Sequence, residues 1–177
     1  VSLTVKMTMN DGLLNAFLLD GQGGGTPLDW AGVRNWAPDQ GALWVHLDFT
    51  QEGTHQWLQQ ESGLDSLIEE ALTADETRPR CEAIDDGLLL SLRGVNTNPG
   101  SEPEDMVSIR LFCTGERVIS TRRRQLLSIA DLIQSLERGN GPRTTGELTA
   151  MLAERLIERM VRVINDLEEH IDEMEEN

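Results

Sequence analysis

The sequence is short of cysteine and of positive charge, and both shortages exclude classes of function. Cys81 and Cys113 belong to no CxxC pair, so they offer no zinc-finger framework and are typical of a reducing compartment. Fifteen Lys and Arg residues stand against 31 Asp and Glu residues, which gives a formal net charge of −16. A nucleic-acid-binding protein needs a basic footprint, so we expect no nucleic-acid partner.

Long hydrophobic runs and a secretory signal are also missing. No apolar run approaches the roughly 20 residues that a membrane-spanning helix needs, and no signal peptide is recognisable. If the protein works in a membrane, we expect the membrane part to lie outside this sequence. A hydrophobic content of 38% with 26% charged residues is typical of a folded protein, and 177 residues suit one domain with an extension.

The common catalytic motifs are absent as well. The sequence contains no GxSxG, no HExxH and no lysine-containing phosphate loop. The glycine-rich segment 20–25 lacks the GxGxxG spacing, so it is interpreted as a turn. Both cysteines lie in apolar strand segments, where an inert core cysteine is a better interpretation than a nucleophile. We therefore expect no enzyme and no resident cofactor.

The hydrophobic periodicity predicts an α+β domain over residues 1–143. Consecutive strands joined by short turns require antiparallel pairing, so the sheet is expected to be largely antiparallel and covered by helices. Residues 144–177 are predicted to form one long C-terminal helix. The predicted strands are 13–19, 43–49, 81–85, 88–95, 106–113 and 117–121, and the predicted shorter helices are 51–61, 65–75 and 128–136.

Two polar groups in the predicted sheet are candidate sites. His46 and Asp48 share one face of strand 43–49 and could hold a metal, although a hydrogen-bonded His–Asp pair is the favoured interpretation. The run Arg122–Arg124, with Arg110 and Arg93 on nearby strands, could hold an anion. In so acidic a chain, internal charge balancing is the favoured interpretation of these arginines.

The long helix changes character along its length. Thr144 and Glu147 have the spacing of a capping box, and a broad apolar face from Leu148 to Ile164 is expected to lie against the domain. Beyond it, only a narrow seam of coiled-coil type remains, which predicts a projecting stalk. The final residues are acidic without Lys or Arg, which is unfavourable at a helix C-terminus, so we expect the helix to continue beyond this sequence. The alternative is a frayed C-terminal helix. The seam residues are Leu167, Ile171 and Met174.

Asp166, His170 and Glu173 form a separate stripe on the same helix, and these are the candidate metal ligands. Their side chains suit zinc or a similar divalent cation. Three ligands on one helix rarely complete a tetrahedron, but several parallel copies could gather cations around an axis. The alternative is a solvated helix face with weak pairs such as Arg162–Asp166.

Several motifs together resemble the N-terminal cytoplasmic domain of the CorA family of metal transporters, most closely its ZntB zinc-transport branch. The resemblance covers essentially the whole chain in the right order. The matching segments are Leu19-Asp20-Gly21, Trp44-Val45-His46-Leu47-Asp48, Thr77-Arg78-Pro79-Arg80, Leu92-Arg93-Gly94-Val95-Asn96, Val107-Ser108-Ile109-Arg110, Val118-Ile119-Ser120-Thr121-Arg122-Arg123-Arg124 and Gly139-Asn140-Gly141-Pro142.

The resemblance implies a domain of α/β/α layers on the cytoplasmic side of the bacterial inner membrane, whose long helix leads toward the membrane. It also implies a homopentamer whose long helices line a funnel, with divalent metal ions as partners. The pore segments and their Gly-Met-Asn signature are absent from this sequence, so transport is not expected of it alone. Zinc is implied by the ZntB branch, and magnesium is the competitor. A soluble acidic interaction module with a C-terminal coiled coil is the alternative from another class.

Overall fold

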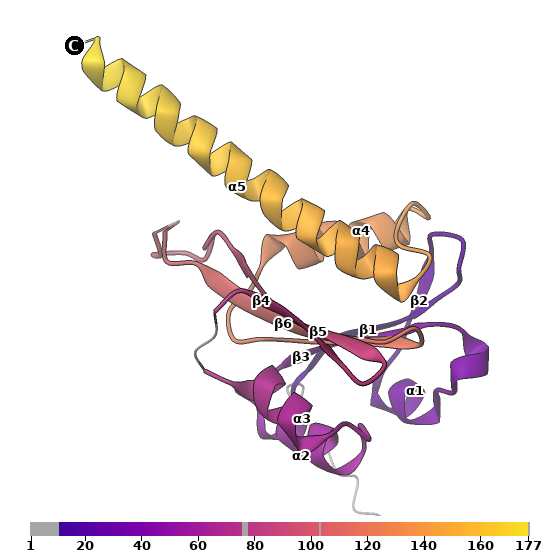
Figure 1. Ribbon diagram of the computed structural model, residues 1–177. Helices are drawn as coiled ribbons and strands as arrows, with labels where there is room; N and C mark the ends of the chain where they lie inside the picture. The colour runs from indigo at the N-terminus through magenta and orange to yellow at the C-terminus, as the bar shows by residue number, and fades with distance from the viewer. Residues whose placement is uncertain (1–10, 76–77, 103, 177) are drawn as a thin grey trace, which may run out of the picture.

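Helices cover both faces of a single sheet in the computed structural model, which describes residues 11–75, 78–102 and 104–176 (Figure 1). Within these residues, seven strands form the sheet in the order β2-β1-β3-β7-β6-β5-β4. The strands are β1 (Leu13–Leu19), β2 (Gly25–Pro27), β3 (Leu43–Asp48), β4 (Arg80–Ile84), β5 (Gly87–Gly94), β6 (Val107–Cys113) and β7 (Arg117–Arg122). The helices are α1 (Trp30–Asn35), α2 (Glu52–Gln60), α3 (Ser66–Thr73), α4 (Leu127–Glu137) and α5 (Thr145–Glu175), with a 3-10 turn at Pro38–Gln40.

The strand pairing confirms the predicted α+β layers and the largely antiparallel sheet. The paired strands run antiparallel except β3 and β7, which are parallel. Every predicted strand and helix is present within a few residues of its expected ends. The sequence reasoning missed β2 and α1, which are too short to show a hydrophobic period. The glycine-rich segment is the expected turn, in which the Asp20 carboxylate accepts from the backbone N–H groups of Gln22 and Gly24.

Successive side chains of β3 point to opposite faces of the sheet, so the interior contains two hydrophobic layers. Leu43, Val45 and Leu47 point toward α1, α2 and α3, and they pack with Trp57 of α2. Trp44 points the opposite way, toward α4 and α5. Both layers are visible in Figure 1, with α1–α3 on one side of the sheet and α4 and α5 on the other.

The long helix α5 starts at a well-formed cap. The hydroxyl of Thr144 accepts from the backbone N–H of Glu147 at 3.1 Å. The Glu147 carboxylate accepts from the N–H of Arg143 at 2.8 Å rather than from that of Thr144. Each contact satisfies one backbone donor at the helix start, which stabilises this end of α5.

Burial of the apolar face of α5 against the domain ends earlier than predicted. Leu148, Leu152 and Leu156 are buried, but the next residue, Ile157, is 59% exposed and Ile164 is 53% exposed. The expectation that the whole apolar face from Leu148 to Ile164 lies against the core is therefore wrong. The last buried leucine reaches β5 because Gly94 has no side chain: a Cβ on Gly94 would lie 2.7 Å from a methyl carbon of Leu156. The C-terminal part of α5 projects from the domain (Figure 1).

Candidate functional site

The projecting part of α5, residues 157–175, is called the stalk below, and it carries an exposed apolar seam. Its positions repeat with spacings of three and four residues, which is the heptad pattern of a coiled coil. Five of the six are at least half exposed, and Met160 is partly buried. An apolar seam of this length on one chain indicates a surface that another helix covers. The seam residues are Ile157, Met160, Ile164, Leu167, Ile171 and Met174.

The predicted stripe of Asp166, His170 and Glu173 lies on the same stalk and is exposed. Its imidazole has a defined orientation, because Nδ1 of His170 lies 2.7 Å from the carbonyl oxygen of Asp166. A carbonyl oxygen only accepts, so Nδ1 carries the proton and donates. In the neutral imidazole the lone pair is then on Nε2, in the arrangement common for metal-binding histidines.

One copy of the stripe does not close a metal site. Among the described residues, no three His, Cys, Asp or Glu side chains are grouped closely enough to hold a metal ion. At about 100° per residue, the stripe also lies about 120° around the helix from the seam. The stripe therefore lies beside the surface that another stalk would cover, and further ligands must come from other molecules.

A bidentate ion pair fixes the base of the stalk. Nε and Nη2 of Arg159 each donate to one oxygen of Asp131 on α4, both at 2.8 Å. This hydrogen bonding raises the pKa of the Arg159 guanidinium. One turn earlier, Arg155 pairs with Glu158 at 3.0 Å. Sequence reasoning missed the Asp131–Arg159 contact, because its partners are distant in the chain and belong to different helices.

The predicted His46–Asp48 pair does not form, so this expectation is wrong. His46 is buried, and its Nδ1 lies 2.8 Å from the hydroxyl of Ser120, its partner across the parallel strands. The Asp48 carboxylate accepts from the backbone N–H and the hydroxyl of Thr50, at 2.9 and 2.6 Å. Asp48 ends β3 and serves the following turn, so the two side chains do not meet to hold a metal.

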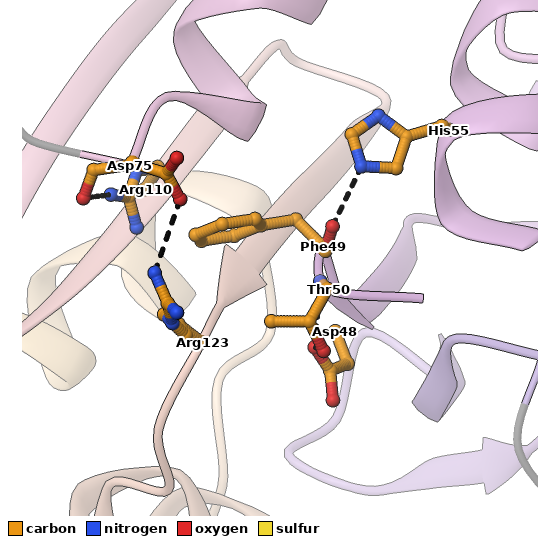
Figure 2. Close-up of polar contacts among 7 residues, drawn as sticks. All are labelled: Asp48, Phe49, Thr50, His55, Asp75, Arg110 and Arg123. Carbon is orange, nitrogen blue, oxygen red and sulfur yellow. Dashed lines mark hydrogen bonds and ion pairs between the residues drawn. The ribbon is translucent and has the colours of Figure 1, made fainter. Parts of the chain in front are cut away.

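The arginines near this turn have mixed roles, as Figure 2 shows. Arg123 pairs with Asp75 at 3.2 Å, which agrees with the favoured charge balancing. Arg110 contacts no carboxylate in this view: its Nη2 donates to the Asp75 carbonyl at 3.2 Å, and its guanidinium carbon lies 4.6 Å from the centre of the Phe49 ring. The Phe49 carbonyl in turn accepts from Nε2 of His55 at 2.7 Å.

Sequence comparison with known proteins decides the family. The profile described as "CorA-like Mg2+ transporter protein" matches residues 39–177. The chain belongs to the CorA family. It is a member of a transporter family and not an enzyme.

The chain has similar sequence identity to two relatives, one named as a divalent cation transporter and one as a zinc transport protein. The chain is 39% identical over 168 residues to the divalent cation transporter CmaX of Pseudomonas aeruginosa, covering 93% of this chain and 50% of that protein. It is 34% identical over 176 residues to the zinc transport protein ZntB of Pectobacterium carotovorum, covering 99% and 53%. The chain thus spans about half the length of these relatives.

Solved CorA-family structures share the fold. The structure of full-length CmaX superimposes with a TM-score of 0.90 at 36% identity, covering 97% of this chain and 53% of that one. The cytoplasmic domain of ZntB from Vibrio parahaemolyticus gives a TM-score of 0.81 at 26% identity, covering 92% and 64%. Within the described part of this chain, no helix has both the length and the apolar character needed to cross a membrane.

Proposed function

We propose that this chain is the cytoplasmic domain of a CorA-family divalent cation transporter. In this proposal the cytoplasmic domain comprises residues 1–143, and residues 144–177 are the start of the helix that leads to the membrane part. The observation that carries the proposal is the stalk, which projects from a domain with the fold of this family and carries an exposed apolar seam with heptad spacing. The similarity to the ZntB cytoplasmic domain supports the cytoplasmic position.

Zinc is the ion that we propose for the transporter. The similarity to a zinc transport protein over 99% of this chain supports it, as does the His-containing stripe on the stalk. Imidazole together with carboxylates is a donor set that suits zinc better than magnesium. Magnesium is the second candidate, because the matching family profile is described as a Mg²⁺ transporter.

Assembly of five copies would turn the stripe into a cation-gathering surface. Five parallel stalks packed through the seam would place five sets of Asp166, His170 and Glu173 beside the helix contacts. The stripe would then concentrate divalent cations, or their binding would shift the packing of the subunits. This pentamer follows the family resemblance, and the exposed seam supports it.

The test is metal uptake by the full-length transporter carrying Asp166→Ala, His170→Ala and Glu173→Ala together. We expect zinc uptake and zinc binding both to fall, because the nitrogen ligand and two carboxylates are lost from each copy. The matched control is Glu169→Ala, Asp172→Ala and Glu176→Ala, which removes three acids from another face of the same exposed helix segment. Unchanged uptake and binding in the stripe variant would refute the cation-gathering role and leave the stalk as a scaffold.

A further inference from the structure

A cavity lies on the α3 side of the sheet, opposite the stalk, and arginines gather around it. Its volume is about 400 Å³, which falls within the range of small-molecule sites. One wall is apolar and comes from α3 and β5, including Leu67, Ala71, Ala74 and Leu89. The charged lining residues are Arg78, Arg80, Arg110 and Glu70.

The strand register explains why the polar lining residues meet. Arg80 of β4 lies opposite Ser91 of β5, and Ser91 lies opposite Arg110 of β6. Residues directly opposite each other share one face of the sheet, with Cβ atoms about 4.5–5.5 Å apart. The three side chains therefore form a row that faces the cavity, and Arg78 adds a third guanidinium at its edge. Among the described lining residues, three guanidinium groups stand against the carboxylate of Glu70, and Arg80 also pairs with Glu82 outside the lining at 3.7 Å. The described lining therefore keeps a net positive charge.

Arg110 is the buried anchor of this row. Arg110 is only 2% exposed. Its guanidinium lies over the Phe49 ring and donates a hydrogen bond to the Asp75 carbonyl (Figure 2). Among the described residues, its Nε has no hydrogen-bond partner. A buried guanidinium with an unpartnered N–H is costly for the fold, so its position in a cavity lining calls for an acceptor.

We propose that the cavity binds a small organic phosphate, with the phosphate on the guanidinium row and an apolar body against α3 and β5. A phosphate monoester carries close to two negative charges at neutral pH, which suits the net positive charge of the described lining. Guanidinium groups also suit phosphate oxygens through paired N–H donors. The proposal does not depend on transport, because the cavity is lined by α3, which lies on the opposite face of the sheet from α5 (Figure 1).

The test is calorimetric titration of the purified chain, in phosphate-free buffer, with phenyl phosphate, inorganic phosphate and benzyl alcohol. We expect saturable binding of phenyl phosphate, weaker binding of inorganic phosphate and no binding of benzyl alcohol. Benzoate, with the same ring and a single charge, is expected to bind more weakly than phenyl phosphate. Equal affinity for inorganic and phenyl phosphate would reduce the site to an adventitious ion only and overturn the proposal.

Substitutions of exposed arginines distinguish binding in this cavity from a general attraction of anions to the protein surface. Arg80→Gln and Arg78→Gln are each expected to weaken phenyl phosphate binding by about three- to tenfold, because each removes a charged donor. The matched control is Arg123→Gln, which lies near Asp75 but outside the cavity lining. All three arginines are exposed, so folding should survive, and thermal unfolding checks this. No saturable binding, or equal weakening in Arg123→Gln, would overturn the proposal.

A third variant tests the apolar wall without changing any charge. Ala71→Leu adds bulk to the α3 wall of the cavity. We expect it to weaken phenyl phosphate binding more than inorganic phosphate binding, because only the former places a ring against this wall. An equal effect on both anions would contradict the proposed placement of the apolar body.

Discussion

His46 shows at the scale of a single residue how burial determines ionisation. Its ring is 1% exposed and lies beside Trp44, whose indole N–H also donates to the Ser120 hydroxyl at 2.9 Å. Burial, assisted by the nearby positive charge of Arg122, lowers the pKa of His46 to about 3. Among the described residues, Nε2 has no partner. The imidazole is therefore a neutral core group rather than a metal ligand.

This lowered pKa predicts a pH dependence of stability. The folded-state pKa of about 3 lies below the unfolded value of 6.5, so between these pH values only the unfolded chain binds the proton. The free energy of unfolding should therefore fall with decreasing pH from about 6.5 toward 3, by about 1.4 kcal/mol per pH unit from this group. Urea unfolding of the chain and of His46→Gln across this range measures it.

Comparison with His46→Gln isolates the contribution of the histidine to the pH dependence, because the many carboxylates titrate in both proteins. We expect the variant to be less stable at pH 7, because a packed side chain is replaced, but to lose stability less steeply in acid. Equal slopes in the two proteins between pH 4 and pH 6 would contradict the assignment of a neutral buried imidazole.

At the scale of an element, two adjacent residues of α5 differ sharply in burial. Leu156→Ala should lower the free energy of unfolding by about 2–5 kcal/mol, because it leaves a cavity beside Gly94 and Leu126. Ile157→Ala, one residue further, should change the stability of the isolated chain by less than about 0.5 kcal/mol, because this side chain is 59% exposed. Denaturant unfolding of both variants makes the comparison. Similar losses would show that the core continues to bury apolar side chains of α5 beyond Leu156.

The same helix shows what sequence alone can and cannot predict. Periodicity predicted α5 correctly, because a helical period is a local property of side-chain spacing, and the predicted seam residues Leu167, Ile171 and Met174 are exposed. It placed the end of the buried apolar face at Ile164, whereas the last buried apolar residue is Leu156, because burial depends on the neighbouring β5 and α4. The cavity was missed for a related reason: Arg80, Ser91 and Arg110 are brought together by strand register. His46 was assigned to Asp48 because alternation gives the face of a residue but not its partner on the next strand.

At the scale of the whole molecule, charge and the seam have opposing effects on assembly. The last turns of the stalk carry a run of acids without Lys or Arg, so parallel stalks bring like charges together. The apolar seam favours association, and a divalent cation bound between carboxylates lowers the repulsion. Net assembly should therefore depend on the ion as well as on the seam.

Light scattering of this chain with and without zinc measures that balance. We expect its mass to rise toward that of a pentamer when zinc is added, and to rise less in NaCl of equal ionic strength, which only screens charge. Ile164→Lys should prevent the increase because it places a charge in the seam, whereas Asn165→Lys adds the same charge at the next residue, outside the seam, and should retain it. A monomer that does not respond to zinc would contradict the stalk's role in assembly, and both association and ion recognition would then have to come from residues outside this chain.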